Sequence, residues 1–378
     1  MINFNVPPFI GSELKFIQQV VDTRKICGDG PFTKKCNAWL ENRFKTQKAL
    51  LTTSGTTALE MSALMCNFQE DDEVILPSYT FSSTANAFVL AGAKLVFVDI
   101  RPDTLNIDEK KIEKAISSKA KAICVVHYAG VACEMDTIME IANRYSLRVI
   151  EDAAQAVMST YKGRALGSLG DFGCFSFHET KNYSMGEGGA ILIKEAANNE
   201  KAEILREKGT DRSKFFRGQI DKYTWVDYGS SYLPSELNAA YLWAQLEQAD
   251  MINNNRLSIW NTYMEAFQPL SDNNLVELPY VPAECAHNAH MFYLKCKNLQ
   301  ERTAFIEYMK EKGILCVFHY IPLHSSSAGK RFGSFNGFDE YTTNESERVV
   351  RLPMFYGLPK TDQEKIIEAT VAFFKDNK

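Results

Sequence analysis

The sequence lacks the features that mark several large classes of protein. No stretch approaches the roughly 18 consecutive apolar residues of a membrane helix, and residues 1–11 lack the basic start and apolar run of a secretory signal. No run of Lys and Arg forms a basic tract, and the net charge is −5 with His neutral, which argues against a nucleic-acid partner. We therefore expect a soluble cytoplasmic protein that binds neither membrane nor nucleic acid.

The cysteines form no framework for a disulfide or a metal. There are nine of them, an odd number, and no two make a C-x-x-C pair. Reduced thiols, mostly buried as small core residues, fit this scatter best. We expect no metal ion, because no cluster of His and Cys accompanies the acidic residues described below.

The first half of the sequence has the pattern of an α/β domain. From about residue 50 to 195, short apolar runs alternate with amphipathic stretches. This alternation predicts a mostly parallel central sheet with helices on both faces. The predicted strands are 73–76, 94–98, 121–127, 148–151, 172–177 and 190–193, and the predicted helices are 56–66, 83–90, 108–116 and 135–145.

The second half predicts a smaller domain. A helical pattern runs from residue 234 to 267, a length that suits one helix bridging two domains. We expect a large α/β domain over residues 1–250 and a small C-terminal α+β domain over residues 251–378. The strands expected in the small domain lie near 290–295 and 315–318, and its helices lie near 301–312 and 362–374.

Two segments suit a phosphorylated, planar ligand, which parallel sheets bind beyond the carboxyl ends of their strands. Residues 51–58 (LTTSGTTA) place small hydroxyl residues before a helix, where free N–H groups favour a phosphate. An ordinary N-cap is the structural alternative. Phe81 also follows a strand, where an aromatic ring can cover a planar ligand or pack in the core.

Two further segments carry groups for chemistry. A strand ends in the pair Glu151-Asp152, and a carboxylate there can hold a cationic ring nitrogen, with Gln155 near the same ligand. A solvated strand cap is the structural alternative. Lys181 lies between an apolar strand and a glycine-rich turn. A desolvated lysine loses its proton and can form a Schiff base with a carbonyl, although most lysines lie on the surface.

Together, these segments supply the parts that pyridoxal 5′-phosphate requires: a phosphate cup, an anion for the ring nitrogen, a covering aromatic and a lysine nucleophile. Neither G-x-x-x-x-G-K-[ST] nor a strand leading into G-x-G-x-x-G is present, which argues against other nucleotide folds. We therefore expect pyridoxal 5′-phosphate as the cofactor, with Asp152 keeping its ring nitrogen protonated.

The same residues resemble a known family. The combination of residues 151–155 (EDAAQ) and 176–178 (SFH) with Lys181 and residues 186–189 (GEGG) is similar to the DegT/DnrJ/EryC1/StrS family of pyridoxal-phosphate sugar aminotransferases. The similarity covers nearly the whole chain and implies the aspartate-aminotransferase fold, fold type I. Lysine at position 181 indicates a transaminase, because a dehydratase branch of the family has histidine there.

The resemblance implies a role for each residue around the cofactor ring. Lys181 is the expected catalytic residue, which binds the cofactor and moves the proton. Asp152 is expected to pair with the ring nitrogen, Gln155 to lie at the ring hydroxyl and Phe81 to stack on the ring.

At the cofactor phosphate, the resemblance implies backbone groups of Thr56 and Thr57 and the hydroxyl of Ser176. Relatives are homodimers with shared active sites, so residues 209–232, rich in Arg and aromatic residues, are expected to reach the partner's site. An ordinary surface loop is the alternative. Leu233 departs from the family, because many relatives have there an Asn that contacts the phosphate from the partner subunit.

The resemblance also indicates the substrates. Residues 127–136, 178–183 and 318–324 are similar to family members that transfer the amino group of L-glutamate to C4 of dTDP-4-dehydro-6-deoxy-D-glucose. The products there are 2-oxoglutarate and dTDP-4-amino-4,6-dideoxy-D-galactose, which is used in lipopolysaccharide or enterobacterial common antigen. The residues expected to line the site of the dTDP-linked keto sugar are His319, Tyr320 and His324.

Three alternatives to this reaction remain open at the level of sequence. The first gives dTDP-4-amino-4,6-dideoxy-D-glucose, which differs in configuration at C4. The second aminates C3. The third is a regulator that binds the cofactor without turnover, because a fold alone does not determine a function.

Overall fold

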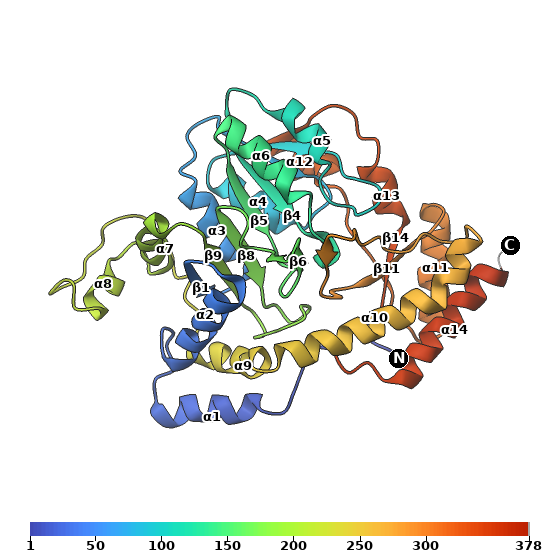
Figure 1. Ribbon diagram of the computed structural model, residues 1–378, viewed down its shortest axis with the longest axis horizontal. Helices are drawn as coiled ribbons and strands as arrows, with labels where there is room; N and C mark the ends of the chain where they lie inside the picture. Colours follow the sequence, from blue (N-terminus) through green and yellow to red (C-terminus); the bar gives the residue numbers. More distant parts are fainter. Residues whose placement is uncertain (377–378) are drawn as a thin grey trace.

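The core of the molecule is an eight-stranded sheet. The structure is a computed structural model and describes residues 1–376 (Figure 1). The strands lie in the order β1-β9-β8-β5-β4-β2-β3-β13. In that order, their bounds are Lys48–Thr52, Gly189–Ile193, Phe172–Ser176, Arg148–Asp152, Ala120–Val126, Glu73–Pro77, Lys94–Val98 and Gly333–Phe335.

The directions of the strands confirm a mostly parallel sheet. β9 pairs antiparallel with both β1 and β8, whereas the other neighbouring pairs are parallel. The carboxyl ends of all strands except β9 therefore meet at one edge of the sheet. The strands expected from the sequence between residues 73 and 193 are all present, with ends that differ by at most one residue. β1 and β13 were not predicted.

Helices cover both faces of this sheet (Figure 1). Along β4, Ile123 and Val125 belong to one buried cluster, whereas Ala122 and Cys124 belong to another on the opposite face. Both faces are therefore apolar, as in buried parallel sheets. The first face packs against α2 (Pro31–Phe44), α6 (Met135–Tyr145) and α9 (Glu236–Leu246), and the second against α3 (Gly55–Met65), α4 (Ser82–Leu90) and α7 (Asn199–Arg206).

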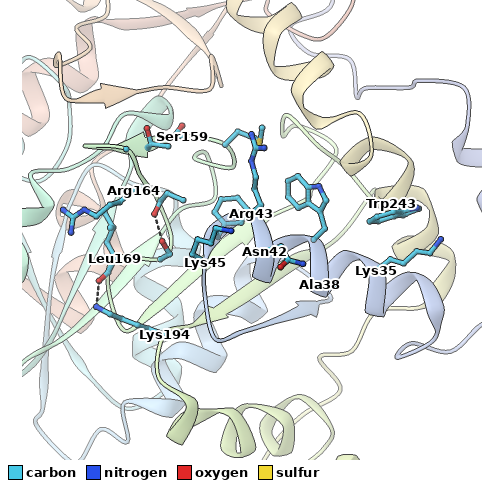
Figure 2. A pocket seen from close by; sticks show the side chains of 17 residues that line it. Lys35, Ala38, Asn42, Arg43, Lys45, Ser159, Arg164, Leu169, Lys194 and Trp243 are labelled. Atoms are coloured by element: carbon cyan, nitrogen blue, oxygen red, sulfur yellow. Dashed lines mark hydrogen bonds between the residues drawn. The ribbon is translucent and has the colours of Figure 1, made fainter.

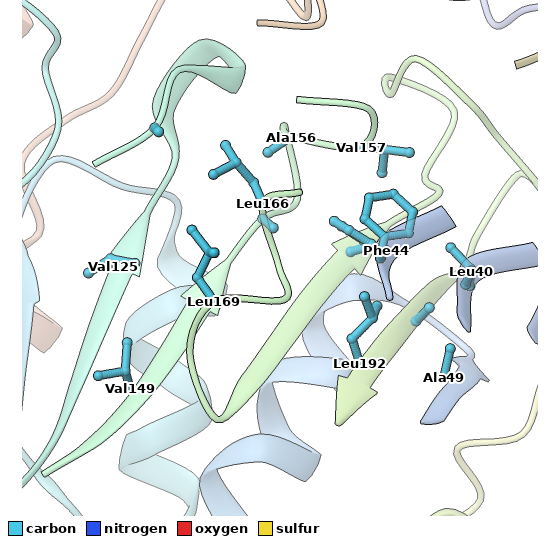
Figure 3. Close-up of a cluster of buried hydrophobic side chains, with 14 of the residues drawn as sticks. Leu40, Phe44, Ala49, Val125, Val149, Ala156, Val157, Leu166, Leu169 and Leu192 are labelled. Carbon is cyan, nitrogen blue, oxygen red and sulfur yellow. The ribbon is translucent and has the colours of Figure 1, made fainter. Parts of the chain in front are cut away.

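Part of the first cluster is drawn in Figure 3, where Leu40 and Phe44 of α2 lie beside Leu192 of β9. The predicted helices 56–66, 83–90 and 135–145 are confirmed as α3, α4 and α6. The stretch 108–116 is shorter than predicted: α5 (Glu109–Ile112) is followed by a 3-10 turn over Glu113–Ala115.

The expectation of one long helix over 234–267 is wrong. The segment forms two helices, α9 and α10 (Ala249–Asp272), and the backbone between them leaves helical geometry at Gln248, with φ −115° and ψ 23°. The reason lies in what each helix packs against. Leu242 of α9 belongs to the core of the large sheet, whereas Tyr263 of α10 belongs to a second buried cluster.

The second cluster surrounds a small antiparallel sheet, in which β14 (Val349–Leu352) lies between β11 (Phe292–Lys295) and β12 (Val317–Phe318). The helices α10, α11 (Leu299–Glu311) and α14 (Lys360–Asp376) pack on this unit. It has the α+β character expected from the sequence. Two features cross the proposed boundary at residue 250: β13 pairs with β3 of the large sheet, and Ile2 packs in the second cluster. The boundary itself stays a prediction.

The remaining elements are short or peripheral. The helix α8 stands away from the body of the molecule in Figure 1. In the described part of the chain, no helix is both long enough and apolar enough to cross a membrane. The bounds of these elements are α1 (Glu13–Thr23), α8 (Arg212–Phe216), α12 (Ser327–Phe332), α13 (Thr342–Arg348), β6 (Thr160–Tyr161), β7 (Arg164–Ala165) and β10 (Cys285–Ala286).

Candidate active site

A cavity of about 470 Å³ lies at the carboxyl edge of the large sheet, where the sequence places most of its candidate residues. Asp152 is the last residue of β5 and Ser176 is the last residue of β8. Segments that follow strands contribute the rest, since α3 begins after β1, and Phe81 lies between β2 and α4. The predicted cofactor residues that line this cavity are Thr56, Phe81, Asp152, Gln155, Ser176 and Lys181.

Asp152 is a buried carboxylate held by two donors. Only 6% of its surface is exposed. The Thr84 hydroxyl donates to Oδ2 at 2.7 Å, and the Ala154 N–H donates to Oδ1 at 3.2 Å. Burial raises the pKa of Asp152, whereas the hydrogen bond from Thr84 lowers it. Because the Thr84 hydroxyl also lies 2.7 Å from the Thr80 hydroxyl, the two threonines form a relay that ends on Asp152.

Lys181 contributes a side-chain amine to the cavity. Burial lowers the pKa of its ammonium from the usual 10.5 to about 8, the charge of Asp152 acts in the opposite direction, and the charge of Arg351 lowers it further. At pH 7 about a tenth of such a lysine is the free amine, which is the nucleophilic form, whereas an ordinary lysine is almost wholly protonated.

The start of α3 presents backbone N–H groups to the cavity. In the described chain, no acceptor engages the N–H groups of Gly55 and Thr56, which belong to the unsatisfied first turn of the helix. A side chain at position 55 would not fit, because a Cβ there would lie 2.8 Å from Cβ of Ser176. Glycine thus allows the helix to approach the end of β8, and the two together form an anion cradle.

Thr57 is not brought into this cavity. Its N–H donates to the Ser54 hydroxyl and its own hydroxyl accepts from the Ser54 N–H, both at 3.0 Å, so that it closes a capping box at the start of α3. The N-cap explanation therefore holds for these two residues. A direct contact of Thr57 with a phosphate stays a prediction that this placement does not favour.

Gln155 and Phe81 are placed for a planar ligand. The Gln155 amide is oriented by the Ala129 N–H, which donates to Oε1 at 2.7 Å, and its Nε2 donates to the Tyr320 hydroxyl at 3.2 Å. Phe81 is 59% exposed although it lines the cavity. A large aromatic ring left open at a polar cavity is suited to stack on a ligand.

The residues expected on the substrate side divide into two groups. His319 and Tyr320 line the cavity. His324 does not: its Nδ1 lies 2.7 Å from the Ser78 hydroxyl and its Nε2 lies 3.2 Å from an Asp339 oxygen. These contacts join the end of β2 to the C-terminal part of the chain. The role of His324 in this structure is therefore a structural one.

The cavity also has residues that the sequence reasoning did not assign to it, among them Phe4, Thr84, His290 and Arg351. Arg351 has the clearest signal, because it is a charge between Val350 and Leu352 in an apolar run. His290 is buried against Asn182, whose Oδ1 lies 2.9 Å from its Nδ1, and burial holds its pKa well below the usual range. Phe4 and Thr84 carry no signal in the sequence alone.

A larger hollow of about 1220 Å³ lies elsewhere, between α2 and the β6–β7 hairpin (Figure 2). Its charged lining is basic, and Lys194 Nζ there donates to the Leu169 carbonyl at 2.9 Å. It contains none of the predicted site residues, so size does not identify the reactive site. In the described part of the chain, no group of three His, Cys, Asp or Glu residues is arranged to hold a metal ion.

Comparison with known proteins shows to which family the chain belongs. The profile of the DegT/DnrJ/EryC1/StrS aminotransferase family matches residues 10–371. The chain belongs to this family. It is 35% identical to the uncharacterized protein MJ1066 of Methanocaldococcus jannaschii, over 99% of this chain and 98% of that protein.

Solved structures agree with this assignment. The aminotransferase TlmJ from Streptoalloteichus hindustanus is 26% identical with a TM-score of 0.91, and all of both chains is covered. The putative sugar aminotransferase Spr1654 from Streptococcus pneumoniae, in its PMP form, is 25% identical with a TM-score of 0.89, again over both whole chains. The chain is therefore an aminotransferase with the expected fold, and its cofactor is pyridoxal 5′-phosphate.

The donor set of the cavity fits this cofactor. A buried carboxylate suits a cationic ring nitrogen, a lysine with a lowered pKa suits the carbonyl, and unpaired N–H groups at a helix start suit the phosphate.

Replacing Thr84 should change how cofactor binding depends on pH. Thr84→Val removes a hydrogen bond to a charged group, worth about 1.5–3 kcal/mol, so the pKa of Asp152 should rise by about one to two units. Asp152 must be ionised to hold the ring nitrogen. On acidification, the variant should therefore lose its affinity for the cofactor at a higher pH than the wild type does. Fluorescence titration across pH measures this, with Thr84→Ser as control. If Thr84→Val and the wild type lose cofactor affinity at the same acidic pH, Thr84 does not have this role.

The lowered pKa of Lys181 can be measured without the cofactor. Trace acetylation followed by mass spectrometry should show reactivity that rises with pH around 8, about two and a half pH units below that of a free lysine peptide. In Asp152→Asn the midpoint should fall further, because the carboxylate charge stabilises the ammonium. A midpoint near 10.5 in the unmodified chain would show that Lys181 is solvated like a surface lysine.

Proposed function

We propose that this chain transfers the amino group of L-glutamate to C4 of dTDP-4-dehydro-6-deoxy-D-glucose, giving dTDP-4-amino-4,6-dideoxy-D-galactose and 2-oxoglutarate. The observation that carries the chemistry is the placement of Lys181 and Asp152 in one cavity, with the lysine pKa lowered to about 8. The choice of sugar is supported by the resemblance of residues 127–136, 178–183 and 318–324 to family members with that substrate.

Bound in this cavity, pyridoxal 5′-phosphate supplies an electron sink for negative charge on the reacting carbon. Asp152 would hold the ring nitrogen and keep it protonated, and the hydrogen bond from Thr84 favours the ionised form of Asp152 despite its burial. Gln155 would contact the ring hydroxyl, and Phe81 would stack on the ring. The N–H groups of α3, including that of Thr56, and the Ser176 hydroxyl would hold the phosphate.

Lys181 moves the proton. A general acid and base works best when its pKa lies near the working pH, because both of its protonation states are then populated. With a pKa of about 8, Lys181 Nζ can take a proton from the donor carbon and later deliver one to the sugar C4. Burial by the surrounding residues is what lowers the pKa of Lys181 into this range.

His319 and Tyr320 are the proposed contacts of the keto sugar, because they line the cavity on the side of the small sheet. Tyr320 also holds the amide of Gln155, so one residue joins the substrate side to the cofactor side. A sugar substrate agrees with the description of Spr1654 as a putative sugar aminotransferase.

The active unit that we propose is a homodimer. Residues 209–232 project from the body of the molecule with α8 (Figure 1) and carry large exposed apolar side chains. Phe216 is 68% exposed and Trp225 is 77% exposed. A patch of this kind on one loop is typical of a surface that another chain covers. Leu233 cannot supply the amide that many relatives bring to the phosphate across this interface.

The reaction should be visible in two steps. The protein loaded with cofactor should show a visible absorbance band that L-glutamate converts to that of the amine form, and Lys181→Ala should not show the conversion. Adding the dTDP-keto sugar should restore the band, and NMR should show an axial amino group at C4. An equatorial amine identifies the D-glucose product instead, and a band that no amino acid alters contradicts the proposed transamination.

The dimer should depend on the projecting loop. Sedimentation velocity should give about twice the 42.7 kDa of one chain. Trp225→Glu should shift the protein toward the monomer, because a charge replaces a buried aromatic contact. Phe338→Glu is the matched control, since Phe338 is 81% exposed on another part of the chain. A monomeric wild type with full activity would contradict the shared site.

A further inference from the structure

A basic hollow lies apart from the cofactor cavity. It is the hollow of about 1220 Å³ between α2 and the β6–β7 hairpin, and none of the described residues lines both it and the cofactor cavity (Figure 2). Phe44 and Leu169, which line it, belong to the buried cluster on the first face of the large sheet. Sites for small molecules commonly have volumes of about 300–1000 Å³. The basic hollow therefore has room for a ligand the size of a nucleotide.

The charged side chains that line the basic hollow are all cations. They are Lys35, Arg43, Lys45, Arg164 and Lys194. Arg43 Nη2 lies 2.8 Å from Asp250 Oδ1. Arg164 pairs in the same way with Asp136. No carboxylate of the described chain pairs with any of the three lysines. A concave surface lined by charges of one sign attracts ligands of the opposite sign, so the basic hollow favours an anion.

Two of the lysines are brought together by the end of α2 and the edge of the sheet. Lys45 follows the last residue of α2, and Lys194 follows the last residue of β9. Between them, the Thr46 hydroxyl donates to the Ile193 carbonyl at 2.7 Å. Lys194 Nζ donates to the Leu169 carbonyl at 2.9 Å, which orients the ammonium and leaves two of its three N–H donors for a ligand.

Aromatic rings line the same hollow. Figure 2 shows Trp243 and Lys35 at one end and Lys45 and Lys194 at the other. Lys35 Nζ lies 5.3 Å from the centre of the Trp243 ring. Trp39 of α2 also lines the hollow, and both tryptophans are only half-buried, so that part of each indole is open. An accessible indole in a cationic groove is suited to stack on a nucleobase.

We propose that the basic hollow binds a nucleoside diphosphate, with the base against Trp39 and Trp243 and the diphosphate held by Lys45 and Lys194. A nucleoside diphosphate carries both an aromatic base and a compact cluster of negative charge, which match the two ends of the hollow. Inorganic diphosphate would engage the lysines alone, and a free nucleoside would engage the tryptophans alone. This site is independent of the reaction proposed for the cofactor cavity.

Trace acetylation of the cofactor-loaded protein reads each lysine separately, so it distinguishes this site from nucleotide binding in the cofactor cavity. As dTDP is titrated, acetylation of Lys45 and Lys194 should fall along one curve, by about tenfold at ten times the midpoint concentration. Inorganic pyrophosphate and thymidine should each require higher concentrations. Protection by dTDP alone supports a site for the free diphosphate, and equal protection by dTDP-glucose supports a site that also takes sugar nucleotides. Absence of protection by both overturns the proposal.

A pair of lysine substitutions locates the anion. In Lys45→Gln/Lys194→Gln, protection of Lys35 should require at least about tenfold more dTDP, because two charged contacts with phosphate are lost. Both substituted lysines are exposed, so the variant should fold as the wild type does. Lys110→Gln/Lys114→Gln is the matched control, since it removes the same charge from two exposed lysines outside the hollow. Identical Lys35 curves for the two double variants overturn the proposal.

The base is tested at the aromatic end. Trp243→Leu should weaken protection of Lys45 and Lys194 by dTDP and leave protection by pyrophosphate as in the wild type, because only the stacking surface is removed. Pyrophosphate that protects the wild type as well as dTDP does would show a site for anions alone and overturn the proposal. Amino transfer from L-glutamate, measured on the same proteins, reports on the cofactor cavity, so its failure rejects the proposed function and not this site.

Discussion

The active site depends on the burial of Lys181 beside Asp152. Burial disfavours the charged form of both groups, so the pKa of the lysine falls to about 8 and that of the aspartate rises. Their opposite charges reduce each of these shifts. The balance leaves a lysine that can exchange protons near neutral pH and a carboxylate that needs support to stay ionised. Thr84 provides that support through a 2.7 Å hydrogen bond.

The large sheet makes this arrangement possible, because consecutive residues of a strand point to opposite faces. Asp152 faces the cavity, whereas Glu151 points into the protein. There the Glu151 carboxylate accepts hydrogen bonds from three backbone N–H groups of residues 167–170 and lies 2.8 Å from Nε2 of buried His127. These contacts fix the end of β5, so one acidic residue anchors the strand and its neighbour serves the cavity.

The small unit completes the site from the opposite side. His290, His319 and Arg351 all come from beyond residue 250 and line the same cavity as Lys181. This placement adds hydrogen-bonding groups and a cation to a site whose cofactor groups come from the large sheet. The predicted cofactor residues and the proposed substrate residues therefore belong to different units of the fold.

The sequence by itself determined the α/β sheet and the cofactor, and it predicted most of the candidate residues that line the cavity, because local patterns encode these: strand periodicity, glycine at the start of α3, and acid and lysine after strands. Only the tertiary structure showed that α9 and α10 are separate helices and that His324 lies outside the cavity, and it favoured the cap over a phosphate contact for Thr57. It alone brought Phe4, Thr84, His290 and Arg351 together. Their partners are distant along the chain, as with Phe4 and Arg351, so no local pattern records the contact.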